Sequence, residues 1–435
     1  MKFMVKNKFS RRKFLSNIAG NLLFFFLANA FLLKRLNAKT KPKIVIVGLG
    51  IGGATCLQYL NKISNLVDII VVEKQNEYQT GPLSNLVIGN ILKRKDICFK
   101  INKKKYEKVK FVYENVSAID VKSKSVRLSK DLKINYDFLI LSPGISYKSD
   151  ILQGYSVTDK KNVPHCWDGE SNIIKFKKRL TDLENNSKII ISSPDYPYRC
   201  PPAPYERASL IANYLRKLNK KVKILILDSK NSFTKQENYF REWKINYSDE
   251  IEWIPRRKGG RVIFYDQKKN LVKNSDGQIF RGDFIHIIPE QKAANIFYDS
   301  GLLNEDKDWC QINPISFEVN HFKDIYAVGD SIDAWAMPKS AFSANSQAKV
   351  LAINLINKIL EKEYVDPVFL NTCYSFSAED RAFSISAWYR LNVQKNKIIS
   401  LGSSESNINA NNNDRKLEAE HAFGWYETMV NDLFI

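Results

Sequence analysis

An unbroken run of apolar residues at 44–47 is followed by a cluster of glycines and then by a helical pattern that ends near residue 60. Four consecutive β-branched residues without polar alternation are typical of a strand that is buried on both faces of a sheet. A second apolar run, at 67–73, has the same character and ends in Glu73. The pattern therefore predicts strand, glycine turn, helix and parallel strand, the first unit of a dinucleotide-binding α/β domain.

The glycines of this turn have separate expected roles. Gly48 permits the tight turn, Gly50 lets the backbone approach a pyrophosphate, and Gly53 lets the helix pack closely on the strand. Glu73 follows Gly48 by 25 residues, about the distance expected for a carboxylate that holds the ribose hydroxyls. The glycine spacing alone is a weak signal, but strand, glycines, helix and terminal acid together predict a dinucleotide site.

Two later strands belong to the same predicted domain. One, at 136–141, breaks at Gly144, and the other, at 325–328, leads into Asp330. Asp330 would accept a hydrogen bond from the ribityl chain of a flavin dinucleotide. A helix from about 342 to 361 follows, and its positive N-terminal end would stabilise negative charge on a reduced flavin.

A second α/β unit is predicted in the middle of the chain. Its elements are a strand at 188–193, a helix at 205–217 and a strand at 221–228. The connection between the first strand and the helix contains five prolines and no glycine. Proline fixes φ and removes an N–H donor, so this connection is poorly suited to cradle a pyrophosphate. We therefore expect the scaffold of a pyridine-nucleotide domain that does not bind NAD.

The N-terminal segment reads as an export signal. Residues 1–40 hold nine basic residues and no acidic one, and Arg11-Arg12 with Phe14 and Leu15 precede an apolar segment at 18–33. This pattern predicts a twin-arginine-type signal peptide over 1–38 and a periplasmic protein exported already folded around its cofactor. The alternative is an uncleaved anchor, but about 16 apolar residues are short for a span that needs about 20. No stable membrane span is expected after signal removal.

The formal charge of the chain is +21. Its lysines are scattered through the body without the aromatic-interleaved basic motif of a nucleic-acid module, so no nucleic-acid partner is predicted. The charge is interpreted as solvated surface, with an acidic electron-transfer partner as a second use.

Several stretches together resemble the flavoprotein subunit of flavocytochrome c sulfide dehydrogenase, a member of the glutathione-reductase-like FAD/NAD(P)-binding superfamily. The resemblance covers essentially all of 41–435 and is carried most specifically by the CPPAPYER and MPKSAFSANSQ motifs. The matching stretches are 80–87, 199–208, 288–293, 328–330, 337–347, 371–375 and 424–426. The resemblance implies an α/β fold with two Rossmann-like dinucleotide-binding domains and a C-terminal α+β domain, together with FAD and a separate haem c partner.

The domain boundaries follow from the pattern and the resemblance together. The FAD-binding domain is expected to be discontinuous, at 41–150 and 285–362. The second domain, without a nucleotide loop, would span 151–284, and the C-terminal domain of the flavocytochrome c sulfide dehydrogenase type would span 363–435. Its β-rich part would begin near Thr372, be interrupted by an asparagine-rich loop at 407–413 and close on a short helix at 418–426.

Carried over by motif, the resemblance implies a redox-active pair of Cys200 and Cys373 beside the flavin, with Glu206 as acid/base. Trp425 would pack near the ring. The full set of predicted FAD contacts is Gly48, Gly50, Gly53, Glu73, Lys74, Gly81, Asn85, Val116, Gly144, Asp330, Lys339, Ser340 and Trp425.

One position departs from the family pattern. Members with covalently attached FAD have a cysteine after the threonine of the loop that here contains Thr80, and this chain has Gly81. We therefore expect FAD to be bound without a covalent bond. The chain also has no Cys-x-x-Cys-His motif, so haem must come from another polypeptide.

The remaining cysteines and the histidines have no assigned chemistry. Cys56, Cys98, Cys166 and Cys310 lack the spacing of metal ligands and are interpreted as packing residues. The four histidines are too dispersed for a metal site or a catalytic triad. No metal site is predicted.

These features lead to a hypothesis of function: oxidation of hydrosulfide through the Cys200–Cys373 disulfide to zero-valent sulfur, with electrons passing through FAD to a c-type cytochrome. A sulfide:quinone oxidoreductase is the first alternative, since it shares the flavin and sulfur chemistry. A redox-silent flavin-binding partner subunit is the second. The sequence leaves open the physiological sulfur donor, the cytochrome, the oligomeric state and which cysteine is attacked first.

Overall fold

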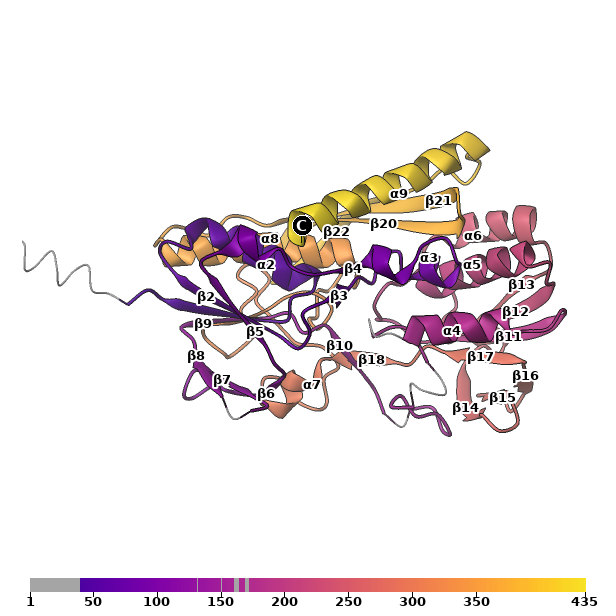
Figure 1. The fold of residues 1–435 in the computed structure, drawn as a ribbon, viewed down its shortest axis with the longest axis horizontal. Helices are drawn as coiled ribbons and strands as arrows, with labels where there is room; N and C mark the ends of the chain where they lie inside the picture. Colours follow the sequence, from indigo (N-terminus) through magenta and orange to yellow (C-terminus); the bar gives the residue numbers. More distant parts are fainter. Residues whose placement is uncertain (1–39, 131, 150, 160–163, 169–171) are drawn as a thin grey trace, which may run out of the picture. The chain divides into compact units, whose positions relative to one another are not determined.

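The computed structural model describes residues 40–130, 132–149, 151–159, 164–168 and 172–435 (Figure 1). Within this part of the chain, Lys43–Ile435 form one compact unit. The predicted signal peptide, residues 1–38, lies outside the described residues. Among the helices that are described, none is both long and apolar enough to span a bilayer.

The first sheet is parallel and is built as the apolar runs predict. Its order is β19-β9-β1-β2-β5, with β1 at its centre. The strands are β1 (Lys43–Val47), β2 (Asp68–Glu73), β5 (Val109–Tyr113), β9 (Phe138–Leu141) and β19 (Ile325–Ala327). Helices α2 (Ile51–Leu60) and α8 (Ala341–Ile359) pack against each other beside this sheet. The carboxyl ends of the strands, where ligands bind in such sheets, therefore lie on one edge.

The second sheet is also parallel, with the order β13-β12-β11-β17. Its strands are β11 (Ser187–Ser193), β12 (Val222–Asp228), β13 (Ile251–Ile254) and β17 (Phe284–Ile287), and its helices are α4 (Asn172–Thr181) and α5 (Ala203–Lys217). Buried apolar side chains from both sheets belong to a common hydrophobic core. Two parallel sheets with helices confirm the predicted fold class, whereas the domain boundaries stay predictions.

Each parallel sheet is accompanied by a small antiparallel meander. The first consists of β6 (Val116–Asp120), β7 (Ser125–Leu128) and β8 (Lys133–Asn135), and the second of β14 (Val262–Asp266), β15 (Leu271–Asn274) and β16 (Ile279–Arg281). The shorter elements are β3 (Tyr78–Gln79), α3 (Ser84–Ile88), β4 (Cys98–Phe99), β10 (Ile145–Tyr147), α6 (Gln236–Glu242), β18 (Gln291–Ala293) and α7 (Asn295–Asp299).

The proline-rich connection is partly helical. Helix α5 begins at Ala203, two residues before the predicted start, with Pro202 at its N-cap and Pro204 in its first turn. The first turn of a helix is where proline is tolerated, because the N–H groups there lack intrahelical acceptors. Two of the five prolines thus start the helix that carries Glu206 and Arg207.

The C-terminal part differs from its sequence-based prediction. Three antiparallel strands, β20 (Val368–Ala378), β21 (Arg381–Asn392) and β22 (Lys397–Glu405), form a sheet along which α9 (Asn412–Leu433) lies (Figure 1). The asparagine-rich loop predicted at 407–413 ends at Asn411, and the predicted short terminal helix is wrong, since α9 has 22 residues. Asn411 caps it by accepting a hydrogen bond from the Asp414 N–H, while the Asp414 carboxylate accepts one from the Asn411 N–H.

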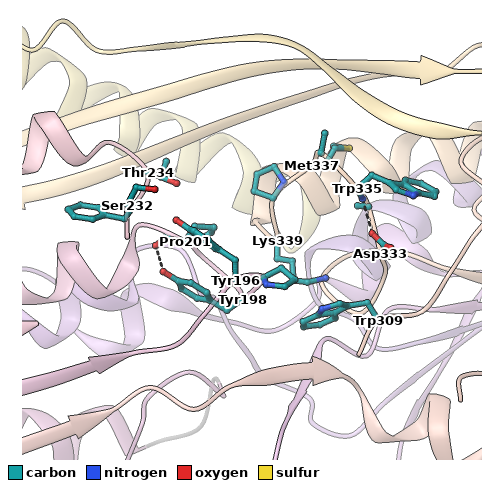
Figure 2. A pocket seen from close by; sticks show the side chains of 15 residues that line it. Tyr196, Tyr198, Pro201, Ser232, Thr234, Trp309, Asp333, Trp335, Met337 and Lys339 are labelled. Carbon is teal, nitrogen blue, oxygen red and sulfur yellow. Dashed lines mark hydrogen bonds between the residues drawn. The ribbon is translucent and has the colours of Figure 1, made fainter. Parts of the chain in front are cut away.

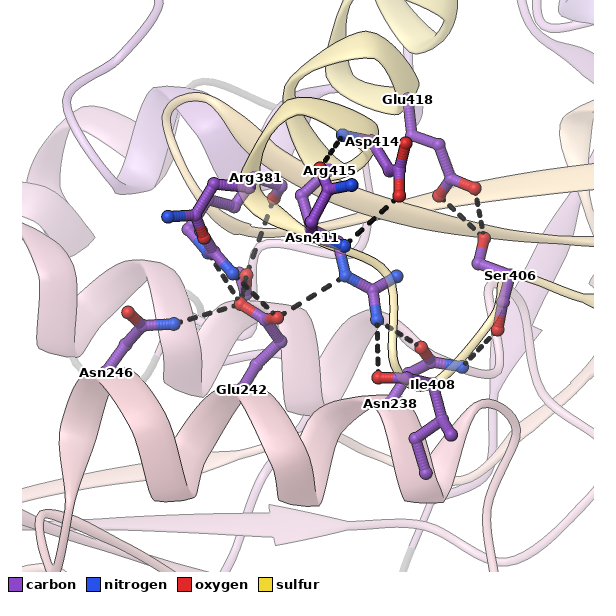
Figure 3. Close-up of polar contacts among 12 residues, drawn as sticks. Asn238, Glu242, Asn246, Arg381, Ser406, Ile408, Asn411, Asp414, Arg415 and Glu418 are labelled. Carbon is purple, nitrogen blue, oxygen red and sulfur yellow. Dashed lines mark hydrogen bonds and ion pairs between the residues drawn. The ribbon is translucent and has the colours of Figure 1, made fainter.

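A buried carboxylate joins the C-terminal part to the second α/β unit (Figure 3). Glu242 in α6 accepts hydrogen bonds from Arg381 at 2.8 and 3.0 Å and from Ser377 at 2.9 Å. Arg415 of α9 lies 3.4 Å from the same carboxylate and is itself fully buried. A buried, multiply paired carboxylate fixes the orientation of the elements that supply its partners. It therefore holds β20 and β21 against α6, which matters because Cys373 lies on β20.

Candidate functional site

The glycine turn has the geometry of a dinucleotide loop. Gly48 has φ +89°, and a Cβ there would lie 2.3 Å from the Ser142 carbonyl oxygen. A Cβ on Gly53 would lie 1.9 Å from the Gly48 carbonyl oxygen, so the close packing of helix on strand requires glycine. A Cβ on Gly50 would meet only the Tyr78 ring, at 3.5 Å or more, so packing does not require glycine there. A Cβ on Gly52, to which the sequence analysis gives no role, would lie 2.7 Å from the Ser142 hydroxyl, so that side chain would have to move.

Glu73 lies at the end of β2 beside this turn. Its Oε2 accepts a hydrogen bond from the Leu49 N–H at 2.6 Å. Val116 begins β6, directly after β5, and β5 pairs with Glu73. Lys74 is exposed. The structure thus brings the glycines, Glu73 and the segment before Val116 to one edge of the first sheet.

The buried carboxylate of Asp330 is the feature of this site that best fits a flavin dinucleotide. Asp330 follows β19, and its Oδ1 is buried without a hydrogen-bond partner among the described residues. Burial raises the pKa of its carboxyl, and the charges of Arg199 and Lys339 oppose that shift. Gly144, after the neighbouring strand β9, has φ +79° and open space where a Cβ would be. An unpaired acceptor beside open space suits a ribityl hydroxyl, so the residues present fit FAD.

Lys339, Ser340 and Trp425 surround the start of α8. The Lys339 ammonium donates to the carbonyls of Asp330 and Ile332 at 2.9 and 2.7 Å, and burial lowers its pKa to about 7. The Ser340 hydroxyl caps α8 through the Ser343 N–H at 3.1 Å. Trp425 stacks on Phe342 in the first turn of α8, with ring centroids 6.1 Å apart. The side chains of Lys339 and Ser340 thus shape the loop before the helix.

The loop between β3 and α3 contains Gly81. A Cβ on Gly81 would meet no atom within 4 Å. The preceding Thr80 hydroxyl lies 2.8 Å from the Tyr426 hydroxyl of α9, which holds the loop in place. The position that carries the attachment cysteine in covalent family members is therefore open here.

The two cysteines singled out by motif lie in one partly buried cluster. They come from parts of the chain that are 173 residues apart, and the structure contains them as separate thiols. Cys200 has φ +59° and donates its N–H to the Lys339 carbonyl at 2.8 Å. A non-glycine residue in the left-handed region is uncommon and concentrates at functional sites. Cys373 lies on β20, where its Sγ is 3.8 Å from the Lys235 ammonium.

The electrostatics of the two thiols differ. Burial raises the pKa of Cys200 well above its ordinary value, and negative charge on Cys373 and Glu206 raises it further. Burial also raises the pKa of Cys373, where the Lys235 charge opposes the shift most strongly. Each thiol responds to the charge of Glu206, and Cys200 to that of Cys373, because the groups lie close together.

Glu206 connects this cluster to α3. Its two oxygens accept hydrogen bonds from the Phe376 N–H at 2.9 Å and the Asn85 amide at 2.7 Å. Burial raises the pKa of the carboxyl, and these two hydrogen bonds oppose the shift. The Asn85 oxygen in turn accepts from Arg207 at 2.9 Å. The side chain of Asn85, a predicted cofactor contact, therefore orients Glu206.

Substitution of Glu206 by glutamine is expected to ease ionisation of the cysteine pair. The carboxylate disfavours both thiolates, so removing its charge should shift the pH at which Cys373 becomes reactive downward, by up to about one unit. The rate of iodoacetamide labelling of Cys373, measured against pH in the reduced holoprotein, checks this. An unchanged or raised midpoint would contradict the placement of Glu206.

Arg207 was missed by sequence analysis. Its guanidinium is 1% exposed and donates to the carbonyls of His165 and Cys166 at 2.9 and 3.2 Å. It also lies 2.8 Å from His286 Nε2 and stacks on Trp167 at 4.3 Å. Burial lowers its pKa to about 10. Arg207 thus ties the segment that carries Cys166 to the cysteine cluster, and no local sequence signal indicates this role.

A pocket of about 500 Å³ opens beside the loop that carries Cys200 (Figure 2). Its lining includes Tyr198 and Pro201 from that loop, Trp309 from the connection between α7 and β19, and Trp335 and Lys339 from the segment before α8. The Lys339 ammonium lies 3.5 Å from the centroid of the Trp309 ring. The pocket borders the Cys200 loop through Pro201 but is not lined by Cys200 itself.

Three protein-family models match this chain. "Pyridine nucleotide-disulphide oxidoreductase" matches residues 42–181. "Sulfide dehydrogenase [flavocytochrome c] flavoprotein chain, central" matches 174–289, and "Flavocytochrome c sulphide dehydrogenase, flavin-binding" matches 365–434. The fold and the first of these define the class, a pyridine nucleotide-disulphide oxidoreductase-type flavoprotein. Within it, the other two matches indicate a FAD oxidoreductase of the flavocytochrome c sulfide dehydrogenase flavoprotein type.

Two characterised proteins are similar to this chain in sequence. Mitochondrial sulfide:quinone oxidoreductase of Dictyostelium discoideum is 25% identical over 340 residues, which cover 73% of this chain and 71% of that protein. Coenzyme A disulfide reductase of Staphylococcus aureus is 30% identical over 118 residues, only 25% of this chain and 27% of the relative.

Solved structures share the fold. Sulfide:quinone oxidoreductase of Aquifex aeolicus superposes with a TM-score of 0.69 at 16% identity, over 90% of this chain and 92% of that one. NDH2 of Plasmodium falciparum, solved in complex with NADH, gives a TM-score of 0.62 at 12% identity, over 79% and 90%.

Proposed function

We propose that this chain is the flavoprotein subunit of a sulfide dehydrogenase that oxidises hydrosulfide to zero-valent sulfur and delivers the electrons to a c-type cytochrome. The observation that carries the proposal is the cluster of Cys200, Cys373 and Glu206. Cys200 lies on the connection where a pyridine-nucleotide domain would carry its glycine loop, and Glu206 of α5 and Cys373 of β20 lie close to it. A thiol pair in that place supplies electrons from sulfur instead of from a nicotinamide.

The proposed thiol chemistry has three steps at the cysteine pair. Hydrosulfide attacks one sulfur of the oxidised Cys200–Cys373 pair, the disulfide bond breaks, and a persulfide and a thiolate result. A second hydrosulfide removes the outer sulfur as hydrodisulfide and leaves a thiol. The pair then returns to the disulfide by giving up two electrons and a proton. Glu206, hydrogen-bonded to the Phe376 N–H and beside both thiols, is placed to accept that proton.

FAD would be held by the glycine turn at its pyrophosphate, by Glu73 at the ribose and by Asp330 at the ribityl chain. When bound, it supplies the step that links a two-electron donor to a one-electron acceptor. The charge of Arg199 opposes the raised pKa of both Asp330 and Cys200. Arg199 therefore links the expected ribityl contact to the cysteine pair.

The FAD is bound without a covalent link, because Gly81 offers no sulfur at the attachment position. Acid precipitation of the purified holoprotein is expected to release nearly all of its flavin into the supernatant. Flavin that remains with the pellet after denaturation would contradict this.

The haem belongs to a separate polypeptide, since the chain has no Cys-x-x-Cys-His motif. The twin-arginine pattern in residues 1–38 supports export to the periplasm, where c-type cytochromes are available as acceptors. A fusion of residues 1–38 to a reporter that depends on the twin-arginine route tests this location.

A sulfide:quinone oxidoreductase is the second candidate, and the relatives from Dictyostelium discoideum and Aquifex aeolicus favour it. The two functions differ in the acceptor. We expect the sulfide-reduced protein to reduce a c-type cytochrome at least about tenfold faster than a soluble quinone. The opposite preference would establish the alternative. A flavin that responds to neither sulfide nor dithiothreitol would instead indicate a silent partner subunit.

A further inference from the structure

Lys235 is a buried lysine beside the proposed redox pair. Its side chain is 1% exposed, although lysine is almost never fully buried unless it is paired. It precedes α6 with φ +63°, in the second α/β unit, and reaches across to β20. The ammonium lies 5.8 Å from the centroid of the Phe383 ring.

The direct partners of this ammonium come from β20. Lys235 donates to the Cys373 carbonyl at 2.8 Å and to the Ser375 hydroxyl at 2.6 Å, and its third short contact is the Cys373 Sγ at 3.8 Å. The carbonyl and the hydroxyl are neutral. Within hydrogen-bond distance, the described partner that can become an anion is therefore the sulfur of Cys373. A buried cation without an anion is costly, and a thiolate at this position would relieve that cost.

Neighbouring charges affect the pKa values of the two cysteines differently. Lys235 is the strongest group that opposes the raised pKa of Cys373. At Cys200, negative charge on Cys373 and Glu206 has a larger effect on the pKa than the cations Lys235 and Arg199. In thiol–disulfide exchange, the sulfur of lower pKa is the better leaving group, so a nucleophile attacks its partner.

We propose that Lys235 stabilises the thiolate of Cys373 and thereby directs hydrosulfide to Cys200. In this step the new S–S bond forms between hydrosulfide and Cys200, and the bond between Cys200 and Cys373 breaks. The electron pair of the broken bond stays on Cys373, next to the ammonium. Cys200 becomes the persulfide. The choice of the attacked sulfur rests on the proposed function, whereas the stabilisation of the Cys373 thiolate does not.

The first test measures the thiol itself. In the anaerobic, phosphine-reduced holoprotein, labelling of Cys373 by iodoacetamide is followed against pH by mass spectrometry. Glu206 of α5, Tyr239 of α6 and Cys200 also face this sulfur, so each variant is compared with the parent at every pH. Lys235→Met should raise the midpoint for Cys373 by about one unit or more, which is about a tenfold slower labelling at a fixed pH below it.

Matched variants separate charge from packing. Lys235→Arg keeps the cation and should keep the midpoint near that of the parent protein, while Ser375→Ala removes a hydrogen bond of Lys235 but no charge and should shift it little. Retained FAD shows that each variant is folded. An unchanged midpoint in folded Lys235→Met would overturn the stabilising role. A midpoint in Lys235→Arg as high as that in Lys235→Met would overturn it as well.

A second measurement needs no variant. The oxidised holoprotein is mixed anaerobically with one equivalent of sulfide, trapped with an alkylating reagent and mapped by mass spectrometry. The added sulfur is expected on Cys200. Sulfur on Cys373 would overturn the inference while the proposed function stands. Sulfur on neither cysteine, together with the Lys235-dependent midpoint, would overturn the proposed function and leave the stabilised thiolate in place.

Discussion

Replacement of Cys200 by serine is expected to lower the rate of flavin reduction by sulfide at least about 1,000-fold. A serine hydroxyl cannot form the disulfide or the persulfide, and residues that act as a unit lose nearly all activity when one is removed. Stopped-flow absorbance of the bound flavin after anaerobic mixing with sulfide gives the rate. FAD content should stay near that of the parent, because the Cys200 backbone N–H that bonds the Lys339 carbonyl is retained.

Cys98→Ser is the matched control. Cys98 is also partly buried, but it lies on β4, where its neighbours are Gln79, Arg94 and Glu77 and not the cysteine cluster. Its rate of flavin reduction should remain within about twofold of the parent. Rapid bleaching in Cys200→Ser would contradict the thiol route, even if the control behaves as expected.

Gly53→Ala is expected to have the largest effect on the folded holoprotein. The added Cβ would lie 1.9 Å from the Gly48 carbonyl oxygen and 3.0 Å from the Gly48 carbonyl carbon, so α2 must move away from β1. Overpacking of this kind costs about 1–3 kcal/mol or more. The displaced turn should also lose its FAD. Thermal unfolding and flavin content after gel filtration measure the two effects.

Gly424→Ala supplies the comparison within a helix. Gly424 lies in α9, and a Cβ there would meet no atom within 4 Å. Because alanine is favoured over glycine in helices by about 0.5–1 kcal/mol, this variant should be slightly more stable than the parent and keep its flavin. Equal behaviour of the two variants would show that the contact at Gly53 does not limit packing.

The sequence was sufficient for the parts of the fold that depend on local pattern. The buried strand before Gly48, the turn and the acid at Glu73 are contiguous or nearly so, and each has a pattern that a parallel sheet requires. The absence of glycine from the connection between β11 and α5 is also evident from the sequence alone. The predicted start of α5 is two residues late, because Pro202 and Pro204 favour a loop in the local pattern although proline also begins helices.

The C-terminal helix shows a second limit. The asparagine-rich stretch at 407–413 favours a loop, but Asn411 is an N-cap, and Arg415 of the helix that it starts pairs with the buried Glu242. That ion pair joins residues 173 positions apart. Helix formation there depends on tertiary contacts that local propensity does not contain.

The polar surroundings of the cysteines could not be predicted for the same reason. Lys235, Arg207 and Asn85 reach the cluster from three separate parts of the chain, and although Asn85 and Arg207 lie in the motif stretches, their contacts depend on the fold. The motif resemblance supplied Cys200, Cys373 and Glu206, and the structure adds the groups that hold and charge them. The central claim depends on what these groups do to sulfur.

Anaerobic titration of the purified holoprotein with sulfide, followed by the visible absorbance of the flavin, tests that claim most directly. We expect the flavin to bleach on addition of sulfide but not of NADH, and we expect this bleaching to be lost in Cys200→Ser. Bleaching by NADH with indifference to sulfide would contradict it.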